Sequence, residues 1–235
     1  MTSVLIAENV SKGFFRNKAL HDLDLKIEEG KVYGLLGPNG SGKTTFFKIA
    51  AGLFKPTSGR MTVMGYPIGA ETKKLTAFMP TDDFLFGWMK IDGILSFYTD
   101  MYEDFDRNKA LEYLTFMELQ ENMKVSSLST GMKARLKLAV TMARKARLYL
   151  LDEPLNGIDP ISREKIVKMI MGAFRDDCAV IISSHLVSEL ETILDEVIFL
   201  DRGTVVLAGD AEKFRLEKSC SIEALYKSFG NMSRP

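Results

Sequence analysis

The chain has 235 residues, 46% of them hydrophobic, and its 31 Lys and Arg residues balance 31 Asp and Glu residues. This length suits one hydrophobic core, and the absence of net positive charge argues against nucleic acid as the main partner. No segment reaches the roughly 20 apolar residues that span a bilayer, and the N-terminal residues lack the pattern of a secretory signal. Since Cys178 and Cys220 also lack a metal-binding or redox spacing, we expect a protein of the reducing cytoplasm.

The first sixty residues are expected to form three strands and a helix. Polar and apolar residues alternate over 4–7 and 23–27, which predicts two strands. Residues 31–36 form a more continuous apolar run, which is typical of a buried central strand. A helix is expected over 43–53, followed by a turn at 56–59, where Pro and Gly occur together.

A further strand is predicted at 75–79, and residues 81–144 have a helical composition. The remaining sequence alternates between the two kinds of element: strand 148–151, helix 162–174, strand 179–183, helix 187–194, strand 196–200, and a turn leading to strand 204–207. Such alternation implies a parallel α/β sheet. Because no linker or repeat interrupts it, we interpret residues 1–235 as one domain, with a helical subdomain at about 81–144 inserted in the α/β core.

The segment between the buried strand and its helix matches the phosphate-binding loop GxxxxGK[ST] in full: Gly37, Pro38, Asn39, Gly40, Ser41, Gly42, Lys43 and Thr44. Its glycines let main-chain N–H groups turn towards phosphate oxygens. Lys43 would bring a positive charge to the β- and γ-phosphates, and the Thr44 hydroxyl would coordinate Mg²⁺. We therefore expect ATP and Mg²⁺ as cofactors here, with Thr45 also at the nucleotide.

Two acids, Asp152 and Glu153, follow the predicted strand at 148–151. In a parallel sheet, residues directly after such a strand lie at the carboxyl edge, beside the phosphate loop. We expect Asp152 to hold Mg²⁺ through water and Glu153 to polarise the attacking water as the general base. A Glu at position 153 therefore favours a hydrolase.

A short polar loop, LSTGMK at 128–133, opens a predicted helix whose first N–H groups form an anion site. The loop resembles the LSGGQ signature of ATP-binding cassette (ABC) ATPases, in the form common among prokaryotic exporter ATPases. In that family the signature faces the γ-phosphate of an ATP held by another subunit. The resemblance implies that Ser129 and Gly131 act on a partner's nucleotide, in a dimer closed by ATP.

Three further positions are similar to family motifs in chain order. The GIDP run at 157–160 resembles the D-loop, so Asp159 would organise the opposite site across the dimer. His185, which closes an SSH run, resembles the switch histidine and would contact the γ-phosphate and orient the water. Phe14 lies where the family stacks an aromatic ring on adenine, for which a Phe ring is adequate. Alternatively Phe15 takes this role, or both rings belong to the core.

One position departs from the family pattern. Thr81, after the strand at 75–79, occupies the place of a Gln that in the family touches Mg²⁺ and the lytic water and relays closure to the membrane subunit. The shorter Thr side chain cannot span the same distance. Either a bridging water intervenes, or Asp82 or Asp83 supplies the ligand, or hydrolysis is slow.

Together these motifs identify the chain as a member of the ABC family. The resemblance implies a P-loop NTPase with a RecA-like parallel sheet core, an N-terminal antiparallel β-subdomain and an inserted helical subdomain. It also implies an ATP-hydrolysing subunit of an exporter, whose dimer, formed with a second copy or a similar ATPase, drives a separate polytopic membrane subunit. The exporter ATPases that it resembles include those of the YtrB type and those that export phenol-soluble-modulin-like peptides. The protein would then be peripheral on the inner face of the cell membrane.

An aromatic segment at 84–89 (FLFGWM) is expected to dock the membrane subunit, or else to fill the core of the helical subdomain. Two other functions stay open. One is a single-cassette ABC protein that works without a transporter, such as a scaffold in iron–sulfur assembly. The other is a regulatory module that binds ATP but hydrolyses it poorly, which Thr81 favours and Glu153 and His185 oppose.

Overall fold

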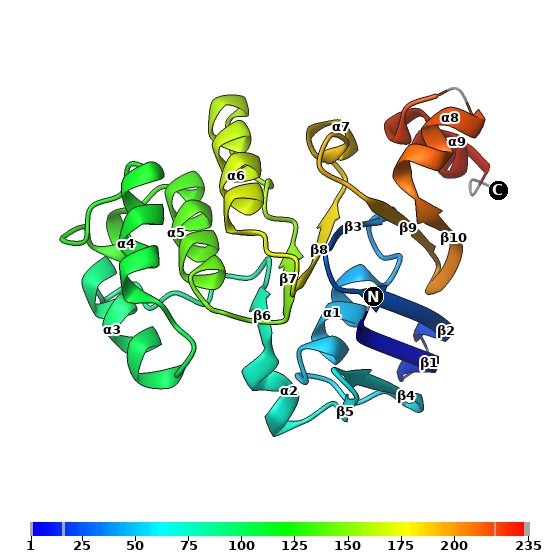
Figure 1. Cartoon of the computed structure of the whole chain (residues 1–235), viewed down its shortest axis with the longest axis horizontal. Helices are drawn as coiled ribbons and strands as arrows, with labels where there is room; N and C mark the ends of the chain where they lie inside the picture. The colour runs from blue at the N-terminus through cyan, green and yellow to red at the C-terminus, as the bar shows by residue number, and fades with distance from the viewer. Residues whose placement is uncertain (1, 16, 219, 233–235) are drawn as a thin grey trace.

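The computed structural model describes residues 2–15, 17–218 and 220–232, and their strands form two sheets (Figure 1). The strands are β1 (Ser3–Phe14), β2 (Asn17–Glu28), β3 (Lys31–Leu36), β4 (Ser58–Val63), β5 (Tyr66–Pro67), β6 (Thr76–Met79), β7 (Leu148–Asp152), β8 (Ala179–Ser184), β9 (Glu196–Asp201) and β10 (Thr204–Asp210). The helices are α1 (Lys43–Ala50), α2 (Ala70–Leu75), α3 (Ile91–Met101), α4 (Arg107–Phe116), the 3₁₀ turn η1 (Val125–Ser127), α5 (Thr130–Met142), α6 (Pro160–Ala173), α7 (Val187–Leu190), α8 (Ala211–Lys218) and α9 (Ile222–Met232).

The smaller sheet has the order β2-β1-β4-β5 and is antiparallel throughout. Strand β1 buries Val4, Leu5, Ala7 and Val10 because bulges interrupt a strict alternation along it. This sheet confirms the N-terminal antiparallel β-subdomain. Strands β4 and β5 were not predicted from the sequence. A turn was expected at 56–59, and β4 begins within it at Ser58.

The larger sheet has the order β10-β9-β3-β8-β7-β6, and all its neighbouring strands are parallel except the β9–β10 hairpin. Strands β7 and β8 are buried along their whole length, because helices cover both faces of a parallel sheet. The P-loop NTPase fold is thereby confirmed, and the carboxyl ends of β3, β7 and β8 meet at one edge.

Helices α3, α4 and α5 lie between β6 and β7 in the chain and form the left side of the molecule in Figure 1. The centre of this group is α5, in which every residue from Leu136 to Met142 is buried. The boundaries of the helical subdomain, about 81–144, remain a prediction, although β6 ends at Met79 and β7 begins at Leu148.

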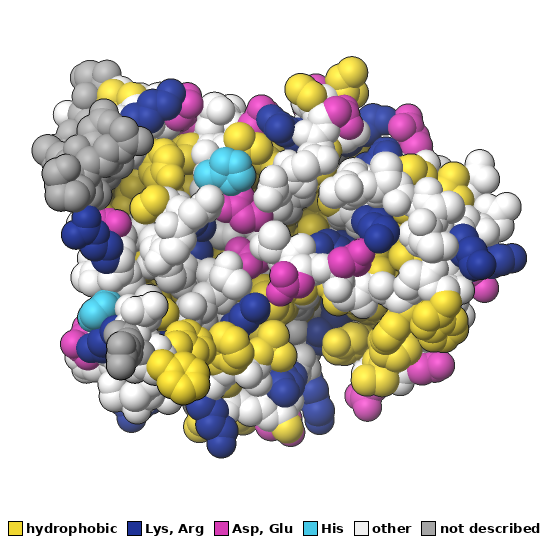
Figure 2. Space-filling view, turned by 180° about the vertical axis from the view of Figure 1, so that it is seen from behind, with side chains coloured by type: hydrophobic (Ala, Val, Ile, Leu, Met, Phe, Trp, Pro, Cys, Tyr) yellow, Lys and Arg dark blue, Asp and Glu magenta, His cyan; other side chains and the backbone are white. Residues whose placement is uncertain are grey.

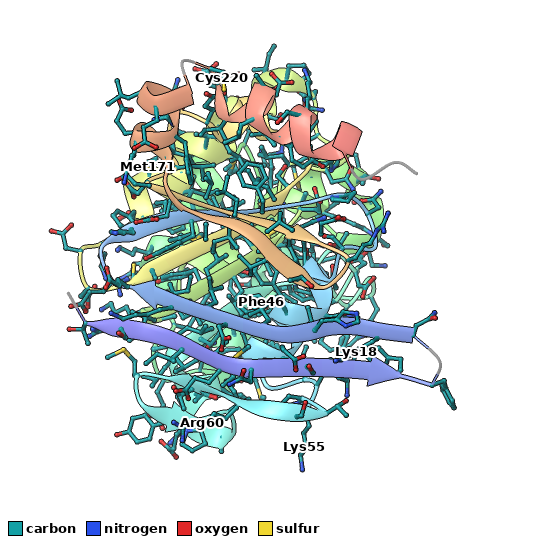
Figure 3. All side chains as sticks on the ribbon, turned by 90° about the vertical axis from the view of Figure 1, so that its right-hand side faces the viewer. Lys18, Phe46, Lys55, Arg60, Met171 and Cys220 are labelled. Atoms are coloured by element: carbon teal, nitrogen blue, oxygen red, sulfur yellow. The ribbon has the colours of Figure 1, made fainter. Side chains whose placement is uncertain are left out.

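The last two helices, α8 and α9, were not predicted. Figure 3 shows them on one side of the β9–β10 hairpin, with the β1–β2 hairpin on the other. Ile222 and Leu225 of α9 are buried, and the Tyr226 ring stacks on Phe199 of β9 with 6.2 Å between ring centroids. None of the helices in the described part of the chain combines the length and the apolar composition that a membrane span requires.

Candidate active site

The phosphate loop joins the end of β3 to the start of α1 and depends on glycine for its shape. Gly40 and Gly42 have left-handed backbones, with φ of 81° and 109°. A Cβ atom on Gly42 would lie 2.6 Å from the main-chain oxygen of Ala19. A Cβ atom on Gly37 would lie 2.2 Å from that of Leu200. Close approach of neighbouring backbone therefore requires glycine at 37 and 42, as the motif does.

Lys43 lies folded inside the loop. Its Nζ donates to the main-chain oxygens of Gly37 (2.7 Å) and Pro38 (3.1 Å), and the residue is 6% exposed. Burial lowers the pKa of the Lys43 ammonium, while the carboxylates of Glu153 and Asp152 act in the opposite direction. The neighbouring Ser41 hydroxyl is buried and has no hydrogen-bond partner in the described part of the chain. A phosphate oxygen in the loop would satisfy both groups.

Asp152 ends β7 and is bonded on both carboxylate oxygens. Its Oδ2 accepts a hydrogen bond from the Thr44 hydroxyl at 2.9 Å, and its Oδ1 accepts one from the Ser183 hydroxyl at 2.6 Å. A hydroxyl and a carboxylate, completed by phosphate and water oxygens, form the all-oxygen ligand set that Mg²⁺ prefers. The residues present therefore fit Mg²⁺, although the described residues contain no cluster of three acidic, His or Cys ligands.

Glu153 follows Asp152 and faces His185. Its Oε2 lies 2.8 Å from His185 Nδ1, and its side chain is 12% exposed against 45% for His185. The Glu153 main-chain N–H donates to the Ser183 hydroxyl at 2.9 Å. Glu153 also has a left-handed backbone, with φ of 51°, a conformation that costs a non-glycine residue about 1–3 kcal/mol. The carboxylate is therefore held in place by strands β7 and β8 together.

The segment after β6 reaches the same edge. The Thr81 hydroxyl donates to the main-chain oxygen of Asp152 at 3.3 Å. Asp82 pairs with Lys48 of α1 at 3.5 Å, and Asp83 pairs with Lys133 at 2.8 Å. Of these three side chains, that of Thr81 is bonded to Asp152, whereas the carboxylates of Asp82 and Asp83 each pair with a lysine.

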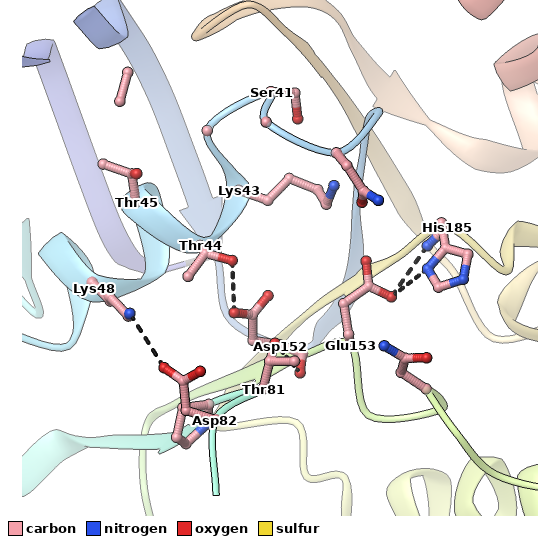
Figure 4. Close-up of a pocket in the computed structure, with 16 residues that line it drawn as sticks. Ser41, Lys43, Thr44, Thr45, Lys48, Thr81, Asp82, Asp152, Glu153 and His185 are labelled. Atoms are coloured by element: carbon pink, nitrogen blue, oxygen red, sulfur yellow. Dashed lines mark hydrogen bonds and ion pairs between the residues drawn. The ribbon is translucent and has the colours of Figure 1, made fainter. Parts of the chain in front are cut away.

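These groups surround a cavity of about 410 Å³, shown in Figure 4. Its lining includes residues 39–45 of the phosphate loop together with Thr81, Asp152, Glu153 and His185. The structure therefore brings the residues predicted for phosphate binding, metal binding and hydrolysis to one place. Their roles remain predictions.

The two aromatic candidates for adenine binding lie outside this lining. Phe14 is 39% exposed, and its ring packs edge-on against Phe54 with 5.5 Å between centroids. The Lys12 ammonium lies 5.0 Å from the Phe14 ring centroid. Phe15 is fully exposed at the turn between β1 and β2. Neither ring belongs to the core, and stacking of Phe14 or Phe15 on adenine stays a prediction.

Ser129, Gly131 and Asp159 also lie outside the cavity of their own chain. Ser129 caps α5 by accepting from the Met132 N–H at 3.2 Å, and Asp159 caps α6 by accepting from the Ser162 N–H at 3.0 Å. Hydrogen bonding to Ser162 lowers the pKa of the Asp159 carboxyl.

The signature and the loop before α6 are neighbours. A Cβ atom on Gly157 would lie 3.4 Å from the Thr130 methyl group, and one on Gly131 would lie 3.9 Å from the Gly157 oxygen. The two exposed helix starts therefore form one surface of the molecule, separate from the phosphate loop.

Sequence reasoning did not assign a role to Ser183 or Lys137. Ser183 is fully buried and orients both acids, and its place at the carboxyl end of a parallel strand was a usable signal. Lys137 donates to three main-chain oxygens of the segment after β6. Nothing in its local sequence indicates this contact, because its partners are more than fifty residues away.

Comparisons with known proteins agree with this geometry. The ABC transporter family matches residues 20–156 of the chain. The linearmycin resistance ATP-binding protein LnrL of Bacillus subtilis is 32% identical over 214 residues, which cover 88% of this chain and 69% of LnrL. The ABC transporter ATP-binding protein YtrB of the same species is 29% identical over 211 residues, which cover 88% of this chain and 72% of YtrB.

Solved structures support the fold. The ATP-binding subunit of an ABC transporter matches with a TM-score of 0.87 at 23% identity, over 96% of this chain and 98% of the other. A dimeric ATP-binding cassette in a post-hydrolysis state, bound to ADP and Pi, matches with a TM-score of 0.79 at 24% identity, over 88% of this chain and 98% of the other. By its family match and its relatives, the chain belongs to the ABC transporter family, as an ATP-binding subunit with ATPase activity.

Proposed function

We propose that the protein is the ATPase subunit of an exporter, and that it hydrolyses Mg-ATP as a dimer closed around two nucleotides. The observation that carries this proposal is the division of the site. The phosphate loop, Asp152, Glu153 and His185 share one cavity, whereas Ser129 and Gly131 lie outside its lining. A second copy, or a similar ATPase, would supply the missing signature. The exporter assignment is supported by the relative named for linearmycin resistance.

The side chains of the cavity support an in-line attack of water on the γ-phosphate. Glu153 would accept the proton of the attacking water, and the contact with His185 Nδ1 at 2.8 Å orients its carboxylate. Lys43 would exchange its two loop carbonyls for phosphate oxygens and stabilise their charge. Thr44 and Asp152 would hold Mg²⁺, which supplies charge neutralisation at the phosphates.

A groove of about 710 Å³ beside this site is suited to the membrane subunit. Its lining includes Phe54 from the loop after α1, Phe84, and Tyr98, Met101 and Tyr102 at the end of α3. Figure 2, which shows the molecule from behind, has hydrophobic side chains on both sides of a gap in the lower half of the view. Met101 is exposed and the aromatic side chains of the lining are partly buried. Aromatic and Met side chains are typical of partner interfaces.

The predicted docking segment at 84–89 lies partly in this groove and partly outside it. Phe84 lines the groove, while Leu85 and Met89 pack against the core. Phe86 and Trp88 are 42% and 72% exposed, with 6.0 Å between their ring centroids. We therefore assign docking of the membrane subunit to Phe84 and the exposed pair Phe86 and Trp88. The protein would then be peripheral on the inner face of the cell membrane.

The test is the substitution Glu153→Gln, with Glu164→Gln as its matched control because Glu164 pairs with Lys168 on the exposed face of α6. We expect Glu153→Gln to bind ATP normally, to lower kcat roughly a hundredfold or more, and to accumulate as an ATP-bound dimer in size-exclusion chromatography with light scattering. The control keeps wild-type turnover. A Glu153→Gln variant that stays monomeric at saturating Mg-ATP, alone and with a membrane partner, contradicts the shared site.

A further inference from the structure

A second buried lysine holds the segment that follows β6. Lys137, in the middle of α5, is 7% exposed. Its ammonium donates to the main-chain oxygens of Pro80 (3.0 Å), Thr81 (2.9 Å) and Asp82 (3.1 Å). An ammonium has three N–H groups, so three consecutive carbonyls use all of them. The lysine is therefore committed to this segment rather than available to a ligand.

Neighbouring contacts extend this attachment. Lys133 lies one turn earlier on the same face of α5, and its Nζ is 2.8 Å from the carboxylate of Asp83. The Lys137 Nζ also lies 5.6 Å from the ring centroid of Phe84. Residues 80–84 are thus attached to α5 at successive positions, through two lysines of one helix.

The other side of the segment touches the acidic edge. The Thr81 hydroxyl donates to the main-chain oxygen of Asp152 at 3.3 Å, and the Asp152 carboxylate accepts from Thr44 at 2.9 Å. Because Lys137 holds the carbonyl of the same Thr81, it determines how closely the Thr81 side chain approaches the end of β7. A continuous set of contacts therefore leads from α5 to the phosphate loop.

We propose that Lys137 is a positioning residue for ATP hydrolysis, which keeps Thr81 at Asp152 by holding the main chain of residues 80–82 against α5. The proposal rests on the roles given above to Asp152 and Glu153. Ser129 caps the same helix eight residues earlier, about 12 Å along its axis. If α5 moves as a rigid helix, a displacement of the signature at its N-terminus would also displace Lys137. Through residues 80–82, Lys137 would pass this displacement to Asp152.

The test uses the full chain and compares two substitutions of Lys137. Lys137→Met keeps the length of the side chain but removes its donors, and Lys137→Arg keeps donors and charge. We expect Lys137→Met to lower kcat about tenfold, with the Kd for a fluorescent ATP analogue within about twofold of wild type. Lys137→Arg restores most of the turnover. Lys168→Met is the matched control, since Lys168 pairs with Glu164 at an exposed site.

A double-mutant cycle with Thr81→Val separates positioning from a merely structural role. Thr81→Val removes the hydroxyl that bonds Asp152 and keeps the shape of the side chain. If Lys137 acts through Thr81, the variant Lys137→Met/Thr81→Val loses no more kcat than its more damaging single substitution. Additive losses, or wild-type kcat in folded Lys137→Met, overturn the proposal.

Two further measurements distinguish a folding failure, and a failure of the proposed function, from a failure of the positioning role. If circular dichroism shows that Lys137→Met does not fold, the cycle is run with Lys137→Gln, which retains an amide donor, and the same two results decide. Glu153→Gln is measured in parallel. Wild-type turnover in that variant would mean that the proposed function fails, whereas an inactive Glu153→Gln with additive Lys137 and Thr81 losses means that only the positioning role fails.

Discussion

The phosphate loop and the segment at 80–84 are each held by a buried lysine, but the two lysines differ in how they are satisfied. Lys43 and Lys137 are 6% and 7% exposed. Burial is the main cause of a lowered pKa at both ammonium groups. Lys43 donates to two carbonyl oxygens five and six residues away, whereas Lys137 donates to three that are at least 55 residues away.

This difference matches the roles proposed for the two residues, phosphate binding for Lys43 and positioning of the main chain for Lys137. Within the described residues, Lys43 uses two of its three N–H donors on its own loop. It could exchange both acceptors for phosphate oxygens without any separation of distant segments. Lys137 uses all three donors on the main chain of another segment, so releasing it would leave carbonyls without partners. The two lysines are equally buried, so it is the number and origin of their partners that distinguish them.

The largest expected effect sharpens this comparison through activity. Lys43→Met removes a charge aimed at the phosphates, and we expect it to lower kcat/KM for ATP roughly a hundredfold or more. This loss exceeds the one expected for Lys137→Met. The measurement is steady-state phosphate release by both purified variants. A Lys43→Met variant that is more active than Lys137→Met would reverse the assignment of the two lysines.

For the free energy of unfolding we expect the opposite order, with a larger loss in Lys137→Met than in Lys43→Met. Lys137→Met removes three charge-assisted hydrogen bonds to partly buried carbonyl oxygens, so we expect it to lower the free energy of unfolding by about 2 kcal/mol. Lys43→Met also removes donors, to the carbonyls of Gly37 and Pro38, but it relieves a desolvated charge at the same time, so we expect a net change of less than about 1 kcal/mol. Urea unfolding of the nucleotide-free proteins measures both, and equal losses would break the comparison.

The smallest expected effect concerns pH. Burial lowers the pKa of Lys43 below its usual value of 10.5. Between the lowered pKa and 10.5, the folded chain binds fewer protons than the unfolded chain, so the free energy of unfolding rises with pH in that window. Lys43→Met lacks this contribution. The difference between wild type and variant is therefore expected to grow in favour of wild type on the alkaline side, in urea titrations at several pH values. A difference that stays constant would indicate an unshifted lysine.

The sequence predicted the phosphate loop and the acidic edge because each depends on local information. A glycine-rich motif between an apolar strand and a helix specifies Lys43 and Thr44. Asp152 and His185 each follow a run of buried residues, and the carboxyl ends of parallel strands must meet at one edge. Elements with a strong one-dimensional signal therefore also gave a correct three-dimensional neighbourhood.

Contacts that depend on packing between distant segments were not predictable in the same way. Lys137 looks like a polar position in a helix until α5 lies against the segment after β6. The ring of Phe14 packs on Phe54, a contact between β1 and the loop after α1 that alignment to a motif does not specify. By contrast, α9 was missed although its pattern was readable, since Ile222, Leu225 and Tyr226 have the i, i+3, i+4 spacing of a helix face.

The position of β3 in the larger sheet also bears on how the protein is made. Lys31 of β3 pairs with Ala179 of β8, and Tyr33 pairs with Glu196 of β9. A nascent chain that ends before residue 179 carries the complete phosphate-loop motif but neither neighbour of the strand that supports it. Pairings of such long sequence separation form slowly, and the apolar strand stays exposed until they do. We therefore expect nucleotide binding to be acquired late in synthesis, and a ribosome-bound fragment that holds the motif to be prone to aggregation before it can bind ATP.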